Sequence, residues 1–225
     1  MFIKRIFYIF IIFLLFLSCG NEKSSSSNLS VEEIFNLAKD QITTSQSFSF
    51  ALAHKEGFTA LPGNYNISKA EGDIEKPNKI LIKSEIISNN LLLKLSYLSI
   101  NEKYWITNPI SFDWIETPSE DNPFKNINPI NIVSDIFFEI ENASIKSVNK
   151  NIYEIKAEIN SNNLKSLVGE IIIPNTKVNL SIFIKEDGLV KKILIYGKVQ
   201  PNDTNLTIRE IKFENWNEKL IWQEP

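Results

Sequence analysis

The sequence predicts a mainly β (α+β) protein, built as one antiparallel sheet with a few helices. Apolar side chains alternate with polar ones in many short runs between residues 45 and 213, which is typical of strands with one buried face. Only three segments, 30–44, 128–140 and 164–168, have helical spacing or capping. Strands joined by short turns favour an antiparallel meander, here of about nine to eleven strands.

The first expected helix covers residues 30–44. Ser30 and Glu33 have the Ser-x-x-Glu spacing of a capping box, in which each side chain binds the other residue's backbone N–H. Apolar residues follow at helical intervals and give the segment one face suited to packing on a sheet. These residues are Val31, Ile34, Phe35, Ala38 and Ile42.

The alternating runs place the strands, and residues 57–66 are expected to form a loop. Asp187 and Gly188 lie between two such runs, which indicates a two-residue β-hairpin turn. In the last run the alternation slips between Ile208 and Ile211, which indicates a β-bulge. The expected strands are 48–52, 67–74, 80–86, 91–100, 104–107, 145–148, 152–159, 178–184, 189–199 and 206–213.

Four prolines interrupt this pattern between residues 109 and 129. Proline cannot donate to a strand ladder, so residues 113–116 are expected in a long connection. Asn128 as a cap and Pro129 in the first turn then indicate a helix that can lie across the sheet as a lid. Its apolar residues are Ile130, Val133, Phe137, Phe138 and Ile140, and a last short helix, 164–168, is expected to end at Gly169.

The N-terminus has the features of an export signal. Lys4 and Arg5 precede an unbroken apolar run from Ile6 to Leu17, and small residues follow. A membrane-spanning helix needs about 20 apolar residues, so this run is too short to cross a bilayer. We therefore expect residues 1–18 to be a signal peptide.

Cys19, the one cysteine of the chain, falls at the expected cleavage site. Its surroundings resemble a bacterial lipobox, although Phe16 stands where leucine is usual. The resemblance implies an acylated Cys19 that anchors the protein in the cell envelope, on the outer face of the cytoplasmic membrane. The alternative is an ordinary secreted protein with an unpaired cysteine. Residues 19–29 then form the acylated cysteine and a Ser-rich flexible tether, which reaches at most about 35 Å when fully extended.

Several segments, taken together and in order, resemble the LppX/LprA/LprF/LprG family of envelope lipoproteins. Asn108 stands where that family usually has aspartate, and Phe183 where tryptophan is common. The likeness covers nearly all of residues 30–225. It rests on residues 72–77, 103–109 with Trp114 and Pro118, 164–169, 183–189, 195–197 and 208–211.

This resemblance implies a strongly curved antiparallel half-barrel whose helices cover the concave face, as in the LolA/LolB carriers. It also implies that residues 30–225 form a domain with a hydrophobic cavity for acylated lipids or glycolipids, which it carries or presents without catalysis. The alternative is a structural or protein-interaction lipoprotein with a filled core. Expected partners are the lipid, the membrane through Cys19 and a transporter or acceptor protein, and the chain is expected to be a monomer.

Strand periodicity selects the residues that would line such a cavity. Residues two apart along a strand share a face. Lys83, Glu85, Lys94 and Ser96 occupy the opposite faces, so the aliphatic side is expected to be concave. The candidate lipid-binding residues are Ile80, Ile82, Ile86, Leu91, Leu93, Leu95 and Tyr97, under a helix bearing Val133 and Phe137.

The inventory of reactive residues does not favour an enzyme. His54 is the one histidine, and without Cys19 no cysteine remains for a nucleophile or a metal site, so no catalytic residue, metal or cofactor is expected. The glycines form neither a nucleophile elbow nor a phosphate loop. The formal net charge of −3 argues against a nucleic-acid partner, which would require a basic surface.

Overall fold

The computed structural model describes residues 29–122, 124 and 126–225. The expected signal peptide, Cys19 and the tether up to residue 28 lie outside the described residues. Within the described part of the chain, no helix combines the length and the apolar character needed to cross a membrane.

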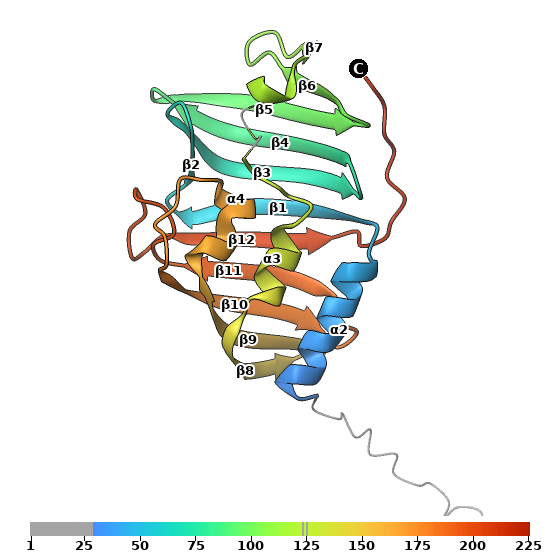
Figure 1. The fold of residues 1–225 in the computed structure, drawn as a ribbon, viewed down its shortest axis with the longest axis vertical. Helices are drawn as coiled ribbons and strands as arrows, with labels where there is room; N and C mark the ends of the chain where they lie inside the picture. The colour runs from blue at the N-terminus through green and yellow to red at the C-terminus, as the bar shows by residue number, and fades with distance from the viewer. Residues whose placement is uncertain (1–28, 123, 125) are drawn as a thin grey trace, which may run out of the picture.

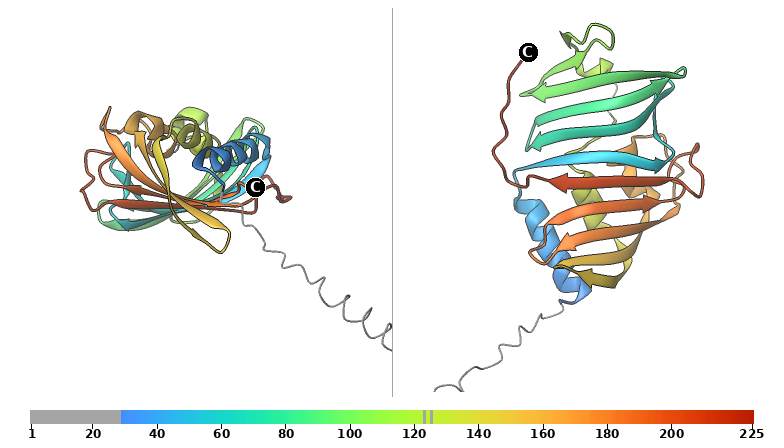
Figure 2. Two further views of the ribbon diagram at one scale, coloured as in Figure 1. Left: turned by 90° about the horizontal axis from the view of Figure 1, so that it is seen from below. Right: turned by 180° about the vertical axis from the view of Figure 1, so that it is seen from behind.

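Twelve antiparallel strands of the described residues form one curved sheet that does not close into a barrel (Figures 1 and 2). The strand order is β7-β6-β5-β4-β3-β1-β12-β11-β10-β9-β8, and β2 pairs with β3. The strands are β1 Ser47–Glu56, β2 Thr59–Leu61, β3 Tyr65–Glu75, β4 Lys79–Ser88, β5 Leu91–Ile100, β6 Lys103–Thr107, β7 Trp114–Glu116, β8 Glu141–Asn149, β9 Ile152–Asn160, β10 Lys177–Lys185, β11 Val190–Tyr196 and β12 Ile208–Glu214.

The centre of the sheet joins strands from the two ends of the folded chain. β1 lies between β3 and β12, and Leu52 of β1 pairs with Ile211 of β12. The earlier strands continue the sheet on one side of β1, and the later strands continue it on the other side. The expected antiparallel half-barrel is thereby confirmed.

Within the described residues, three α-helices lie on the concave face: α2 Val31–Thr44, α3 Ile132–Phe138 and α4 Lys165–Val168. The same part of the chain contains two 3₁₀ turns, η2 Ser119–Asp121 and η3 Ser161–Leu164. α2 and α3 lie over β8 to β12, which we call the covered half, and α4 lies over the centre of the sheet and contacts β2. We call β3 to β7, which extend mostly beyond the helices, the uncovered half (Figure 1). Only the connection from β7 to α3, which contains η2, runs across the uncovered half.

The capping box of α2 forms as predicted. The Ser30 backbone N–H donates to Glu33 Oε2 at 2.7 Å, and the Glu33 N–H donates to Ser30 Oγ at 3.2 Å. The hydrogen bond from the Ser30 backbone N–H to the Glu33 carboxylate is the main reason that the pKa of Glu33 lies below its usual value. The apolar face of α2 is buried through Ile34, Ala38 and Ile42.

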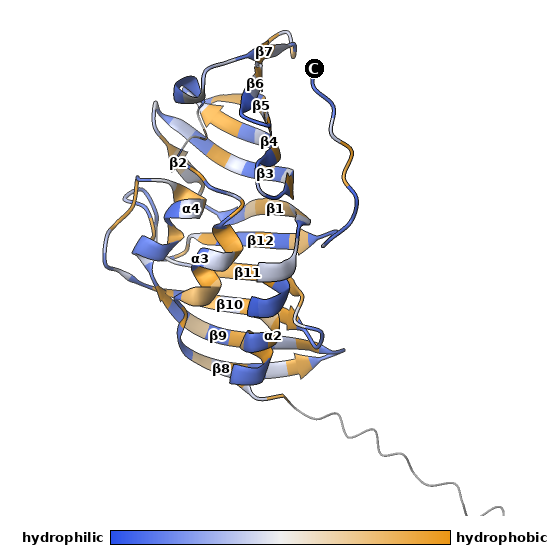
Figure 3. Cartoon of the chain, turned by 45° about the vertical axis from the view of Figure 1, so that its right-hand side comes forward, coloured by the Kyte–Doolittle hydropathy of each residue, from blue (hydrophilic) through white to orange (hydrophobic). Residues whose placement is uncertain are grey.

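The main hydrophobic core lies between the helices and the sheet, and it continues onto the inner faces of β3, β4 and β5 through Ile74, Ile82 and Tyr97. Hydrophobic and hydrophilic residues alternate along its strands (Figure 3), so each strand turns one apolar face to the helices. Phe35 of α2 and Phe137 of α3 meet edge to face, with ring centroids 5.8 Å apart. Fully buried members include Val133, Ile136, Ile155, Leu180, Ile182 and Ile193.

Two short strands lie where the sequence predicts irregular backbone. Residues 113–116, expected in a connection, contain the edge strand β7, and the expected loop 57–66 contains β2. Each strand has three residues, too few to show an alternating pattern.

The helix expected from Asn128 begins later, at Ile132, because the Asn128 carbonyl accepts the Asn131 N–H in a preceding turn.

The hairpin between β10 and β11 differs from the predicted two-residue turn. Residues 186–189 form a four-residue loop, closed by a Lys185 N–H bond to the Leu189 carbonyl at 2.9 Å. Gly188 alone in this loop has a positive φ, +87°. A Cβ at Gly188 would also lie 2.7 Å from the Leu37 backbone in α2, so glycine is required both for conformation and for space.

The predicted bulge between Ile208 and Ile211 is wrong. β12 pairs with β11 in unbroken register, and the irregularity lies in β1, between His54 and Glu56. The apparent slip in the sequence arises because Arg209 occupies an inward position that would ordinarily be apolar. Arg209, Ile211 and Phe213 all lie buried.

Candidate functional site

The uncovered half carries an open apolar groove of about 320 Å³ on its concave face. Ile86 of β4, Leu93 and Leu95 of β5, Ile106 of β6 and Ile115 of β7 line it, because the pleat turns these residues to the same side. Tyr65, Thr107, Asn108, Pro109 and Asp121 complete its wall. We call this space the apolar groove.

An aromatic cluster on β5 and β6 adjoins the lining strands. Tyr97 of β5 stacks on Tyr104 of β6 with ring centroids 6.5 Å apart, and Phe124 packs against Tyr97 at 6.0 Å. Burial raises the pKa of the Tyr97 hydroxyl. Beyond Leu95, these rings fill the inner face, so the apolar groove occupies the part of β5 closest to the β4–β5 turn.

A second space lies enclosed between the sheet and the helices, but it holds only about 20 Å³. Ile82 borders it together with Phe50 and Phe124, and Ile132 and Leu167 face it from the helices. A void of about 15 Å³ accommodates a single water, so this space is too small for an acyl chain. The covered half is a packed core as well, because its inward residues, such as Ile155, Ile182 and Ile193, are fully buried.

The candidate lipid-binding residues do not all lie in the apolar groove. Ile86, Leu93 and Leu95 meet in the apolar groove, Ile82 borders the small enclosed space, and Tyr97 belongs to the aromatic cluster. Ile80 is half-buried, whereas Leu91 is 64% exposed at the start of β5. Val133 and Phe137 are buried in α3 over the covered half, away from the groove (Figure 1).

Seven groove residues escaped the sequence analysis: Tyr65, Ile106, Thr107, Asn108, Pro109, Ile115 and Asp121. Ile106 follows the period of two in an expected strand and could have been included. Ile115 could not, because its strand was expected to be irregular. Tyr65 begins β3 within the segment that was expected to be a loop, and Pro109 reaches the groove through the path of the loop after β6.

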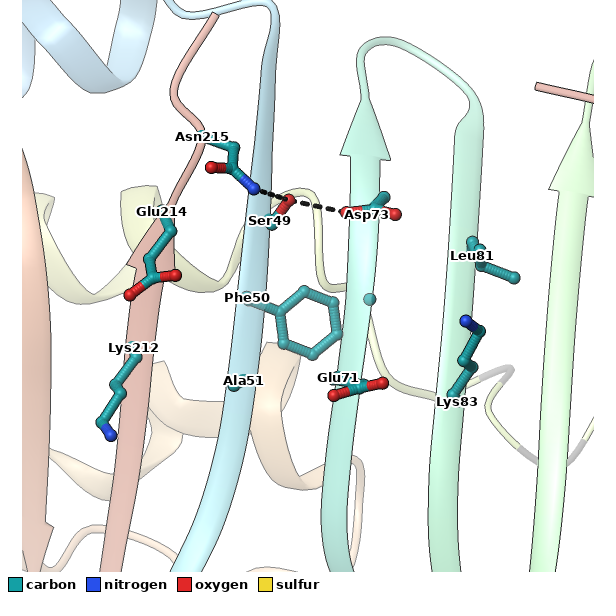
Figure 4. A pocket seen from close by; sticks show the side chains of 11 residues that line it. Ser49, Phe50, Ala51, Glu71, Asp73, Leu81, Lys83, Lys212, Glu214 and Asn215 are labelled. Carbon is teal, nitrogen blue, oxygen red and sulfur yellow. Dashed lines mark hydrogen bonds between the residues drawn. The ribbon is translucent and has the colours of Figure 1, made fainter. Parts of the chain in front are cut away.

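The convex face carries a polar depression of about 440 Å³ across β12, β1, β3 and β4 (Figure 4). Ser49 Oγ donates to Asp73 Oδ1 at 2.6 Å and accepts from Asn215 Nδ2 at 3.2 Å. Lys83 and Lys212 lie on the same face, in agreement with the predicted charged convex side. This lining does not suit an apolar ligand.

A buried polar cluster lies beside the loop that joins β11 to β12. Arg209 makes two contacts with Asp203, Nη1 to Oδ2 at 2.9 Å and Nη2 to Oδ1 at 2.8 Å. It also donates to Thr59 Oγ1 and to the Phe58 carbonyl. Among the described residues, no buried side-chain nitrogen or oxygen lacks a hydrogen-bond partner, so this cluster is internally satisfied.

His54 extends this cluster. Its Nδ1 lies 2.9 Å from the Ser68 carbonyl and its Nε2 lies 3.0 Å from Thr59 Oγ1. Because a carbonyl can only accept, Nδ1 carries the proton and Nε2 accepts from the Thr59 hydroxyl. Burial is the main cause that lowers the pKa of His54 to about 4. The described residues contain no group of three or more metal-binding side chains.

No family model matches the chain, and no curated protein matches its sequence. Solved structures do match. LprF from Mycobacterium bovis aligns over 86% of this chain and 96% of its own, at 12% identity and a TM-score of 0.66. The Mycobacterium tuberculosis lipoprotein LppX aligns over 85% and 99%, at 13% identity and a TM-score of 0.53.

A LolA superfamily protein from Nitrosomonas europaea also aligns, over 86% of this chain and 96% of its own, at 9% identity and a TM-score of 0.30. The shared fold rests on the LprF and LppX structures. The resemblance to the LppX/LprA/LprF/LprG family that the sequence indicates is confirmed at the level of the fold.

Proposed function

We propose that this protein is an envelope lipoprotein that binds the acyl chains of a lipid or glycolipid in the apolar groove and carries or presents that lipid without catalysis. One observation supports this proposal most directly. Near the β4–β5 turn, the concave face of β4 to β7 keeps an aliphatic lining that no residue of α2, α3 or α4 joins.

The volume of the groove fits this role. Pockets for small ligands usually measure about 300 to 1,000 Å³ and have mostly apolar walls with a few polar groups. The apolar groove has about 320 Å³, and Asn108 and Asp121 lie at its margin among aliphatic side chains. Acyl chains gain free energy in such a place through burial, by about 0.8 kcal/mol for each methylene group.

The described end of the proposed tether lies far from the groove. Cys19 would hold the protein in the membrane, and its tether ends at Leu29, whose N–H lies 3.4 Å from the Tyr153 hydroxyl on β9. Adjacent strands are about 4.8 Å apart, so β5 and β9 lie roughly 35 Å apart across the sheet. The groove can therefore face away from the membrane that holds the anchor, toward a transporter, an acceptor protein or another lipid surface.

The alternative function is a scaffold whose sheet and helices are solid. Close packing beneath the helices favours it, because the space between them and the sheet holds only about 20 Å³. In this case the apolar groove would be a contact surface for a protein and would hold no lipid.

Lipid extraction distinguishes the two functions. The chain from residue 28 onward is produced in bacteria without Cys19, purified without detergent and extracted with organic solvent for mass spectrometry. A carrier yields a defined acylated lipid in near-stoichiometric amount. A scaffold yields only the trace lipids found with an unrelated exported protein, and this result would refute the carrier proposal.

A further inference from the structure

Strand β5 extends beyond its neighbour β6. β5 pairs with β4 from Leu91 to Ser99, but with β6 only from Tyr97 to Ile100. After Thr107 the chain turns into the loop that leads to β7, and in Figure 1 the early part of β5 projects past the β6–β7 hairpin. Among the described residues, 91–96 therefore form a sheet edge with no strand beside it.

The backbone groups of this edge point outward in a regular way. The Ser96 N–H, on the β6 side, donates to Thr107 Oγ1 at 2.8 Å, whereas the Leu95 carbonyl, on the β4 side, accepts from Ser84 Oγ at 2.8 Å. Backbone groups alternate in direction along an antiparallel strand. The N–H and C=O groups of Leu92 and Lys94 thus face the same side as the Ser96 N–H, where no strand of the described chain meets them.

Each face of the sheet has a hollow next to this edge. On the concave face lies the apolar groove, lined here by Leu93 and Leu95. On the convex face lies a hollow of about 570 Å³, lined by Lys83, Lys94, Ser96, Phe112 and Trp114 among others. A strand added at the edge would send alternate side chains into the two hollows, which is how β-strand addition obtains specificity.

Charge indicates what the added strand contains. Lys69 in the convex hollow pairs with Glu85 at 3.3 Å, while Glu85 and Glu71 face Lys94 and Lys83 in the strand register. Three lysines and two glutamates line this hollow, so one positive charge is in excess, and neither Lys83 nor Lys94 forms an ion pair with a described residue. A carboxylate on the added strand opposite Lys94 would supply that partner, because opposite charges on directly facing residues attract. A second copy of this edge cannot supply it, since Lys94 is the one charged residue of 91–96.

We propose that residues 91–96 bind an extended segment of a partner protein as an additional β-strand. The segment places apolar side chains in the apolar groove and an acidic side chain opposite Lys94. Leu91 and Leu92 are 64% and 62% exposed, which leaves the start of the edge accessible to such a partner. The segment and an acyl chain would occupy the same groove, so they bind in turn and not together. The inference itself rests on backbone geometry and charge and does not require lipid binding.

The test uses the full-length chain in lipid nanodiscs and a short fluorescent peptide in which valine alternates with threonine, with aspartate at one central threonine position. Leu92→Pro removes an outward N–H without touching the ladder to β4, and Leu92→Thr keeps that N–H as the matched control. Fluorescence anisotropy should show a loss of affinity of about tenfold or more for Leu92→Pro, because backbone hydrogen bonds are lost. Leu92→Thr should bind as the parent does.

A charge exchange at Lys94 tests the proposal independently of whether the proline variant folds. Lys94→Glu leaves the backbone intact and should weaken the aspartate peptide while favouring a peptide with lysine at that position. Equal binding of every peptide to every variant, or equal binding of a peptide with methylated backbone nitrogens, would overturn the proposal. So would a parent protein that is dimeric through this edge and becomes monomeric in Leu92→Pro.

Discussion

Arg209 and Asp203 form a buried ion pair at the junction of the two halves of the sheet, and neither side chain exposes more than 3% of its surface. Asp203 Oδ2 also accepts the backbone N–H groups of Val199 and Gln200. The pair thus joins β12 to the loop that leads into it. If one side chain of such a pair is removed, the charge of the other stays buried without an opposite charge beside it.

Arg209→Leu should lower the free energy of unfolding by about 3 to 5 kcal/mol, because Asp203 would remain buried and unpaired. Chemical denaturation at neutral pH measures this loss. Lys192→Leu, which removes a partly exposed ion pair with Glu210 at 3.7 Å, serves as the control and should cost less than about 1 kcal/mol. Similar effects of the two changes would contradict a stabilising role for the buried pair.

Stability should fall as the pH drops from about 6.5 toward 4, in part through His54. Its pKa in the folded protein is about 4, below its value of 6.5 when unperturbed, so the unfolded chain binds the proton more readily. The contribution is complete above pH 6.5 and is lost as the pH falls through this window, by about 3 kcal/mol in total. Unfolding measured across the window should show a shallower slope for His54→Asn than for the parent protein.

Gly188→Val should lower the free energy of unfolding by about 1 to 3 kcal/mol, because valine resists a positive φ. The close approach of Leu37 adds a steric conflict with α2. Thermal melting measures the effect. Gly197→Val is an informative comparison, because φ is +84° there but no atom lies within 4 Å of an added Cβ. A melting temperature unchanged in Gly188→Val would contradict the structure of this loop.

Leu93→Trp should reduce lipid uptake with little change in thermal stability, because the larger side chain enters the open apolar groove. In a filled core the same change would overpack the interior and cost about 1 to 3 kcal/mol. Leu92→Trp, on the adjacent residue and the opposite face, is the matched control and should leave uptake unchanged. A large loss of stability in Leu93→Trp, together with no lipid in the parent protein, would exclude the carrier function.

Cys19→Ala should release the exported protein from the membrane, because the acyl anchor can no longer form. Among the described residues no helix can replace it as a membrane span. Fractionation after a salt wash measures the change, and the variant should appear in the soluble exported fraction. Retention of the variant in the membrane pellet would show that Cys19 is not the anchor.

Local chemistry accounts for the elements that the sequence predicts correctly. The reciprocal Ser30 and Glu33 pair starts α2, and the alternation of Ile80, Ile82 and Ile86 marks one face of β4, because both signals act within a few residues. Arg209 is a residue whose position a local sequence pattern does not explain. A buried arginine looks like a break in the apolar pattern until its partners Asp203, Thr59 and Phe58 are placed around it.

The sequence by itself determined the antiparallel strands, the three helical segments, the inward faces of β4 and β5 and the residues from which a lipid site could be built. Only the tertiary structure decided that α3 covers the later strands, so that Val133 and Phe137 complete the packed core while Leu93 and Leu95 face an open groove. Periodicity fixes the side to which a residue points, because it follows from the pleat of one strand. The position of a helix over particular strands depends on contacts between segments far apart in the sequence. A local pattern does not specify these contacts.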